Sequence, residues 1–115
     1  MNPRILFVSE DILFWGRVHA LATSMARDVK RVGDEASMQA AFAEGGFSRV
    51  IVDLGCRAVD VLAWAPRLKG VSPPPVLIAF GSHVDDEAMT AARAAGFDHV
   101  MPNSRFSRSM REWLD

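Results

Sequence analysis

Three acidic side chains and a serine follow two of the short apolar runs in this sequence. Ser9, Glu10 and Asp11 come after the first run, and Asp53 ends a later one. Mg²⁺ prefers oxygen ligands and takes one or two carboxylates together with water and phosphate oxygens. If the fold gathers these residues, the sequence predicts a Mg²⁺ site made by Glu10, Asp11 and Asp53. The alternative is structural: Glu10 and Asp11 would sit at a helix N-terminus, where the macrodipole favours them, and Asp53 would cap a turn.

Short apolar runs alternate with segments of helical spacing, and together they determine where these side chains lie. Short runs without polar alternation are typical of strands that helices cover on both faces. The expected strands are residues 5–8, 29–32, 50–52, 76–80 and 99–101, and the expected helices are 12–27, 34–44, 60–68, 85–95 and 104–114. This alternation predicts a five-stranded parallel sheet of the α/β class with helices on both faces.

Connection rules then narrow the topology. Right-handed crossovers favour the strand order 2-1-3-4-5 of the doubly wound, flavodoxin-like (CheY-like) fold. In such sheets a ligand binds at the carboxyl ends of the strands, where the strand order switches. That switch falls between strands one and three, which is where Ser9, Glu10, Asp11 and Asp53 are expected to meet.

Composition excludes several classes of function. The 115 residues suit one domain, 1–115, and the 13 basic and 14 acidic side chains give no general attraction to nucleic acid or to an anionic membrane. The single cysteine, Cys56, excludes an internal disulfide, and no apolar run approaches the roughly 18–20 residues that span a bilayer. The cytoplasm is the expected location. With no Ser-His-Asp set and no CxxC pair, no catalytic residues are assigned and the chain is not expected to be an enzyme.

Over essentially its full length the chain resembles the receiver domains of bacterial two-component signalling, the domains of response regulators. Receivers carry an acidic pair after strand one, a phosphate-accepting Asp at the end of strand three, a Ser or Thr after strand four and a Lys after strand five. The resemblance implies that Asp53 is the phosphoryl acceptor and that the acidic pair holds Mg²⁺ with it. The pair is either Ser9-Glu10 or Glu10-Asp11, and both registers stay open.

Two positions depart from the receiver pattern. The Ser/Thr position falls on Phe80 or Gly81, with Ser82 slightly later as the candidate switch residue. The Lys position falls on Asn103, and Arg105 is the nearest substitute cation. Arg does not replace the compact charge of Lys. These departures resemble those of atypical receivers, or pseudo-receivers, in which the fold works without ordinary phosphorylation.

The resulting hypothesis is a stand-alone atypical receiver that acts in signal transduction through protein contacts. Its partner, or a second copy, would engage the face made by strand four, strand five and the last helix. The candidate contact residues on that face are Arg105, Arg108, Arg111 and Trp113. One alternative is a phosphorylatable receiver, and another is a module that binds a nucleotide or flavin at the strand ends. Mg²⁺ is the one cofactor that the pattern suggests, and no nucleic-acid or membrane partner is expected.

Overall fold

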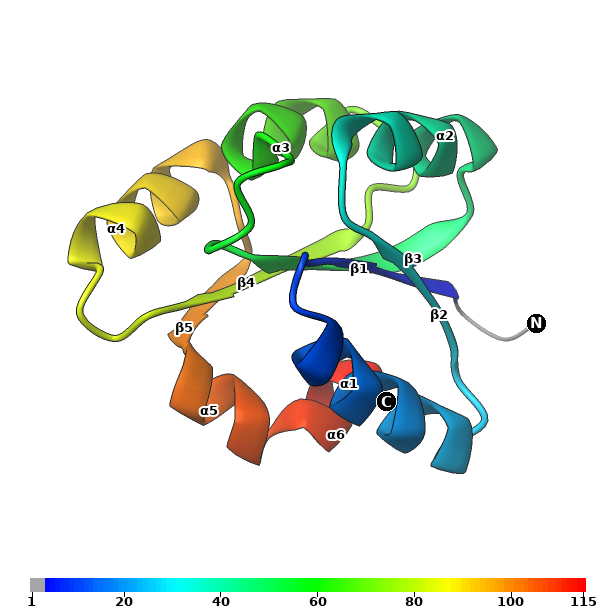
Figure 1. The fold of residues 1–115 in the computed structure, drawn as a ribbon. Helices are drawn as coiled ribbons and strands as arrows, with labels where there is room; N and C mark the ends of the chain where they lie inside the picture. Colours follow the sequence, from blue (N-terminus) through cyan, green and yellow to red (C-terminus); the bar gives the residue numbers. More distant parts are fainter. Residues whose placement is uncertain (1–3) are drawn as a thin grey trace.

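A computed structural model describes residues 4–115, which form a five-stranded sheet between two layers of helices (Figure 1). The strands are parallel and lie in the order β2-β1-β3-β4-β5. Their bounds are β1 (Arg4–Val8), β2 (Asp28–Val32), β3 (Phe47–Asp53), β4 (Val76–Gly81) and β5 (His99–Pro102). The predicted flavodoxin-like, doubly wound fold is therefore confirmed.

Helices cover both faces of the sheet, as the apolar strands require. One layer contains α1 (Ile12–Ser24), α5 (Asn103–Arg108) and α6 (Met110–Leu114). The opposite layer contains α2 (Glu35–Glu44), α3 (Val61–Lys69) and α4 (Asp86–Ala95). Each layer packs its own apolar cluster against the sheet. No helix among residues 4–115 has the length and apolar character needed to cross a membrane.

Aspartates begin four of the helices. The carboxylates of Asp11, Asp34, Asp60 and Asp85 each accept a hydrogen bond from a backbone N–H in the first turn that follows. Such caps satisfy donors that the helix itself leaves unpaired. Two of these caps, Asp34 and Asp85, lie at the first residues of helices expected from the sequence, and the helix expected over 85–95 ends at Gly96, whose φ of 107° is left-handed.

The predicted last helix is wrong in one respect, because it is divided in two at Ser109. The Ser109 hydroxyl donates to the carbonyl of Arg105 at 2.6 Å and accepts from Trp113 Nε1 at 3.0 Å. A serine that bonds back to the preceding turn competes with the regular helix ladder and bends it. The first helix also ends earlier than predicted, at Ser24, and Ala26 has a positive φ of 55° just beyond it.

The register of the central strands brings the candidate site together. Val8 pairs with Val52 across β1 and β3, and Asp53 pairs with Phe80 across β3 and β4. Since the strands are parallel, the loops after β1, β3 and β4 leave the sheet at the same edge. The residues after these strands therefore meet at this edge, and we call the group formed by Ser9, Glu10 and Asp53 the Asp53 crevice.

Candidate functional site

Asp53 is the centre of this crevice, and donors of the protein reach both of its carboxylate oxygens. The hydroxyl of Ser9 donates to Oδ2 at 2.8 Å, and the backbone N–H of Gly55 donates to Oδ1 at 2.8 Å. Ser9 is fully buried, and its Oγ also accepts from the N–H of Asp11 at 3.1 Å. These contacts fix the Ser9 hydroxyl between β1 and β3 and orient the Asp53 carboxylate.

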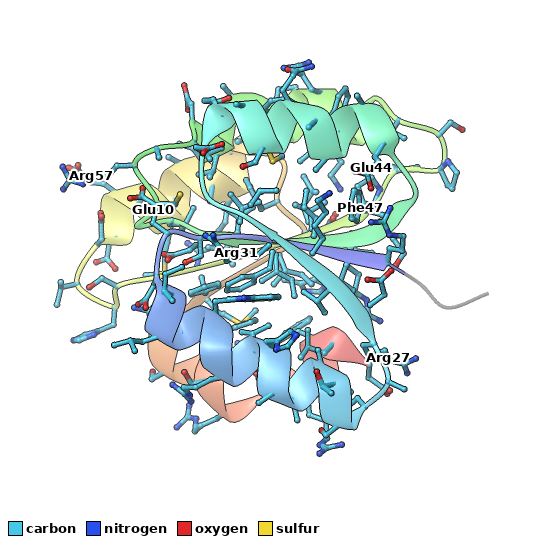
Figure 2. All side chains as sticks on the ribbon, turned by 45° about the vertical axis from the view of Figure 1, so that its right-hand side comes forward. Glu10, Arg27, Arg31, Glu44, Phe47 and Arg57 are labelled. Atoms are coloured by element: carbon cyan, nitrogen blue, oxygen red, sulfur yellow. The ribbon has the colours of Figure 1, made fainter. Side chains whose placement is uncertain are left out.

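Glu10 binds the loop that follows β3. Its Oε1 accepts from the backbone N–H groups of Arg57 and Ala58, both at 2.7 Å, and lies 3.5 Å from the Cys56 sulfur. Figure 2 shows Glu10 and Arg57 close together at this end of the sheet. The N–H groups of Ala58 and Arg57 hold the pKa of Glu10 below its usual value. The charged Glu10 side chain therefore links the β1–α1 and β3–α3 loops through these hydrogen bonds.

Asp11 is the N-cap of the helix that follows it, α1. Its Oδ1 accepts from the N–H of Phe14 at 2.9 Å, which is the capping contact of α1. Ser9 and Glu10, in contrast, contact Asp53 and the loop after it. Of the two registers left open by the sequence, this placement puts Ser9 and Glu10 beside the end of β3.

The three carboxylates predicted as Mg²⁺ ligands bind three different parts of the backbone. Glu10 binds the β3–α3 loop, Asp11 binds α1, and Asp53 binds the turn at Gly55. Within residues 4–115, no group of three His, Cys, Asp or Glu side chains is arranged to hold a metal ion. This arrangement does not gather the three carboxylates into the Mg²⁺ site that a receiver fold implies, because each of them binds a separate part of the backbone. The Mg²⁺ site stays a prediction.

An aromatic stack occupies the position where a receiver has its Ser or Thr. Phe80, the partner of Asp53 in the ladder, is buried and turned toward α1 and α5. Its ring stacks on Phe106 with centroids 4.4 Å apart and an interplanar angle of 8°, and it lies 5.2 Å from the Phe14 ring. Phe7 completes the stack 6.0 Å from Phe80. An apolar ring, with no hydroxyl, therefore lies beside Asp53 in the sheet.

The residues after Phe80 provide no substitute at the same place. A Cβ on Gly81 would lie 3.2 Å from a side-chain atom of Leu54, so this position leaves little room for a larger residue. Ser82 is exposed, and its Oγ accepts weakly from the N–H of Val84 at 3.4 Å within the β4–α4 loop. Ser82 thus contributes to a turn, and its switch role stays a prediction.

A cation that the sequence did not single out contacts the backbone of Ser9. Arg31, on β2, donates from Nη1 to the Ser9 carbonyl at 2.9 Å (Figure 2). A Cβ on Gly33 would lie 2.6 Å from the same nitrogen, so a larger residue there would displace this end of the Arg31 side chain. Asn103 is the exposed first residue of α5. Arg105, the predicted substitute cation, lines a groove along β5.

Two of the four residues predicted as partner contacts, Arg105 and Trp113, lie together in the structure. Arg105, Arg108 and Arg111 are exposed, whereas Trp113 is half-buried and packs against the core. Arg105 and Trp113 line the same groove beside His99, whose ring lies 4.8 Å from that of Trp113. Arg108 and Arg111 do not line this groove.

Glu10 gives the crevice a pH-dependent contribution to stability. Because its pKa is lowered by folding, its contribution is present above the ordinary value of 4.5 and is lost as the pH falls through the folded pKa. Denaturant titrations from pH 7 down to pH 3 should therefore show a smaller acid loss of unfolding free energy in Glu10→Gln than in wild type. At pH 7 the variant should be less stable, since its amide cannot compensate the two N–H groups with a charge.

The matched control is Glu112→Gln, which changes an exposed carboxylate of α6 in the same way. Identical pH profiles for wild type and Glu10→Gln would show that the Glu10 hydrogen bonds add nothing to the free energy of unfolding.

The sequence matches no family model and no curated protein. Solved structures match along nearly the whole chain. NtrX from Brucella abortus has a TM-score of 0.80 at 18% identity over 99% of this chain, and the match spans 27% of the NtrX chain. A response regulator receiver domain protein (CheY-like) from Methanospirillum hungatei JF-1 has a TM-score of 0.80 at 15% identity over 100% of this chain and 95% of its own.

A third match carries a metal. The receiver domain of sensor histidine kinase PA1611 from Pseudomonas aeruginosa PAO1 has a TM-score of 0.77 at 13% identity, and the match covers 99% of this chain and 98% of that one. That structure has a magnesium ion coordinated in its active site cleft. At these identities the similarity establishes the fold. The chain has the CheY-like fold of response-regulator receiver domains, with Asp53 at the end of its third strand.

Proposed function

We propose that this chain is an atypical receiver domain that acts in signal transduction through protein contacts, without efficient phosphorylation of Asp53. The carrying observation is the pair of hydrogen bonds that hold Asp53, from the Ser9 hydroxyl at 2.8 Å and from the Gly55 N–H at 2.8 Å. A receiver with an acidic residue in place of Ser9 would direct a second carboxylate here. This chain directs a neutral donor instead, which favours a structural role for Asp53.

The chemistry of phosphoryl transfer supports the same proposal. Catalysis of this transfer is mostly positioning and compensation of charge on the phosphoryl oxygens. The three positions that would provide an acid, a hydroxyl and a cation carry Ser9, Phe80 and Asn103. None of the three brings a charge, and the ring of Phe80 is stacked on the ring of Phe106. Arg31, a cation on β2, is already bonded to the Ser9 carbonyl.

Phosphorylation of Asp53 is the second candidate, and one observation favours it. Asp53 is partly exposed at the end of β3, in a fold whose relatives include a receiver with magnesium in its cleft. For this candidate, Ser9 would have to release Oδ2 and Glu10 would have to leave the β3–α3 loop. Both steps break hydrogen bonds of 2.7–2.8 Å.

Intact mass spectrometry distinguishes the two candidates. The protein is incubated with acetyl phosphate and Mg²⁺ beside Asp53→Asn, which keeps the size of the side chain and removes its nucleophile. We expect both spectra to stay unmodified. A mass increase of one phosphoryl group that appears in wild type and is absent from Asp53→Asn would contradict the proposal.

A further inference from the structure

We propose that a cavity between the sheet and helices α2 and α3 binds a small, neutral, aromatic molecule of two fused rings. The residues that line it come from β1, β3, α2, α3 and the loops beside them, and include Phe42, Phe47, Ser48, Leu68, Val71 and Pro73. We call it the Phe47 cavity. It lies at the amino ends of the strands, and Figure 2 shows Phe47 at this end of the sheet and Glu10 at the other. The site is separate from the Asp53 crevice, so the inference goes beyond the proposed function.

The size of the cavity suits a molecule of two fused rings. Its volume is about 350 Å³, within the range of roughly 300–1,000 Å³ that is usual for small-molecule sites. An apolar cavity of about 150 Å³ holds a single benzene ring. Leu6 and Val50, both fully buried in the central strands, close its inner end. A bound molecule is therefore limited to about twice the size of benzene.

Two aromatic side chains of the lining are held in place by groups outside the cavity. The guanidinium of Arg4 lies 4.6 Å from the centroid of the Phe47 ring and is paired with Glu44 at 3.1 Å. The Phe42 ring contacts the ring of Trp64, with centroids 5.3 Å apart. Because these walls are already ordered, an aromatic ligand can pack against them with little further loss of side-chain entropy.

Two glycines leave one side of the cavity free of side chains. Gly45 and Gly46, which connect α2 to β3, have positive φ values of 68° and 82°, where other residues are strained. A Cβ at either position would meet no atom of a more distant residue within 4 Å, so the space beside them is open. Val71, which also lines the cavity, is 38% exposed although valine is usually buried. A ligand would therefore cover apolar surface that now faces solvent.

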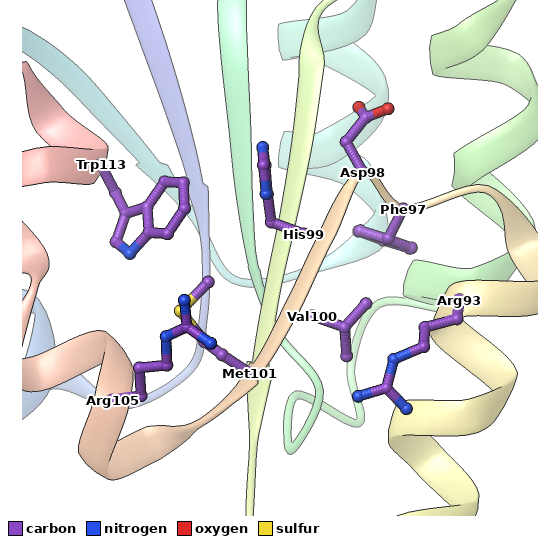
Figure 3. Close-up of a pocket in the computed structure, with 8 residues that line it drawn as sticks. All are labelled: Arg93, Phe97, Asp98, His99, Val100, Met101, Arg105 and Trp113. Atoms are coloured by element: carbon purple, nitrogen blue, oxygen red, sulfur yellow. The ribbon is translucent and has the colours of Figure 1, made fainter.

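The lining indicates a neutral ligand. Within residues 4–115, the side chains that line the Phe47 cavity carry no charge, and the guanidinium of Arg4 beside it is already paired with Glu44. The groove along β5 is different, since Arg93 and Arg105 line it (Figure 3). Burying a charge without a partner is costly, so a charged molecule such as a nucleotide is disfavoured in the Phe47 cavity.

One hydroxyl of the lining can orient a ligand. Ser48 is exposed, and its Oγ donates to the carbonyl of Arg4 at 3.3 Å. A serine hydroxyl has one proton to donate and two lone pairs, so the Ser48 oxygen can still accept from an N–H of the ligand. Indole has two fused rings, no charge and one N–H, and it is therefore the probe of choice.

The test titrates indole into the methyl-labelled full chain without Mg²⁺ or phosphodonor. We expect saturable methyl shifts at Leu68 and Val71, intermolecular nuclear Overhauser effects from indole to the same methyls, and a Kd of about 1 mM or lower. Indole-3-carboxylate and tryptamine carry a negative and a positive charge. Both should bind at least about tenfold more weakly than indole, because the described lining residues are uncharged.

Variants of the protein complete the test. Val71→Trp should weaken indole binding by about fivefold or more, because the larger side chain takes apolar contact area from the ligand. The matched control is Val84→Trp, which changes an exposed valine of the β4–α4 loop in the same way and should bind as wild type does.

Four results would each overturn the inference: equal binding of the charged analogues, contacts confined to another surface, equal effects of Val71→Trp and Val84→Trp, or no binding at millimolar indole. Methyl shifts at Val71 that depend on protein concentration without indole would show that a second copy covers the cavity, and would overturn it as well. A phosphoryl adduct on Asp53 would contradict only the proposed function.

Discussion

Replacing Phe106 by alanine is expected to lower the free energy of unfolding by about 3–5 kcal/mol, the usual cost of deleting a buried aromatic side chain. Phe106 is fully buried and contacts Phe80 and Phe14 at centroid distances of 4.4 and 5.8 Å. Its loss leaves a cavity between α5 and the sheet and removes two ring contacts. Urea denaturation monitored by circular dichroism measures the change.

The matched control for this prediction is Phe106→Leu, which keeps most of the volume and loses the stacking. Its cost should be clearly smaller than that of the alanine variant. A loss below about 1 kcal/mol in Phe106→Ala would show that the aromatic stack does not hold α5 against the sheet.

Ser9→Asp is expected to make the stability of the protein depend on Mg²⁺. Ser9 is fully buried and 2.8 Å from an Asp53 oxygen, so the substitution places a second carboxylate against the first. Like charges at this separation destabilise the folded state unless a cation lies between them. We expect a lower Tm for the variant without Mg²⁺ and a progressive rise as Mg²⁺ is added, since binding to the folded state stabilises it.

Ser9→Asn is the control, because it has the size of Asp and carries no charge. It should lose the Ser9 hydroxyl contact and show a Tm that does not respond to Mg²⁺ beyond the response of wild type. Equal responses in Ser9→Asp and Ser9→Asn would contradict the claim that residue 9 determines whether this crevice attracts a cation.

The sheet could be predicted from the sequence because its strands are covered on both faces. The apolar runs around Phe7, Ile51 and Ile78 show no polar alternation, and these three side chains are fully buried in the centre of the sheet. Aspartates and glycines then mark where helices begin and end. The order of the strands followed from general rules of connection, and the strand pairs confirm it.

The location of the crevice could be predicted from the sequence, but the contacts within it could not. Parallel strands bring Ser9, Glu10 and Asp53 to one edge, but the direction of each side chain depends on donors elsewhere in the chain. Glu10 turns to the N–H groups of residues 57 and 58, and Ser9 turns to Asp53, 44 positions away. The contact of Arg31 with Ser9 could not be predicted, because nothing in the sequence of β2 indicates that this side chain reaches the end of β1.

The aromatic stack could not be predicted from the sequence, although the sequence does show that Phe80 stands where a hydroxyl is expected. Phe80 departs from the hydroxyl that the receiver pattern expects, but its partners Phe14 and Phe106 come from helices at both ends of the chain. Periodicity places each of them on the core face of its helix without showing which rings meet. The break at Ser109 could not be predicted for a similar reason, since a serine is compatible with a helical pattern and only its side-chain bond to the preceding turn divides the helix.

The most direct test of the central claim is whether the Asp53 crevice can hold a phosphoryl group at all. Beryllofluoride with Mg²⁺ mimics an aspartyl phosphate and needs no phosphodonor, so it separates binding from the rate of transfer. Amide spectra of the ¹⁵N-labelled protein should show no saturable shift at Ser9, Asp53 or Gly55, because Asp53 stays bonded to Ser9 and Gly55. A saturable shift at these residues that extends to Phe80 and is absent from Asp53→Asn would contradict the account.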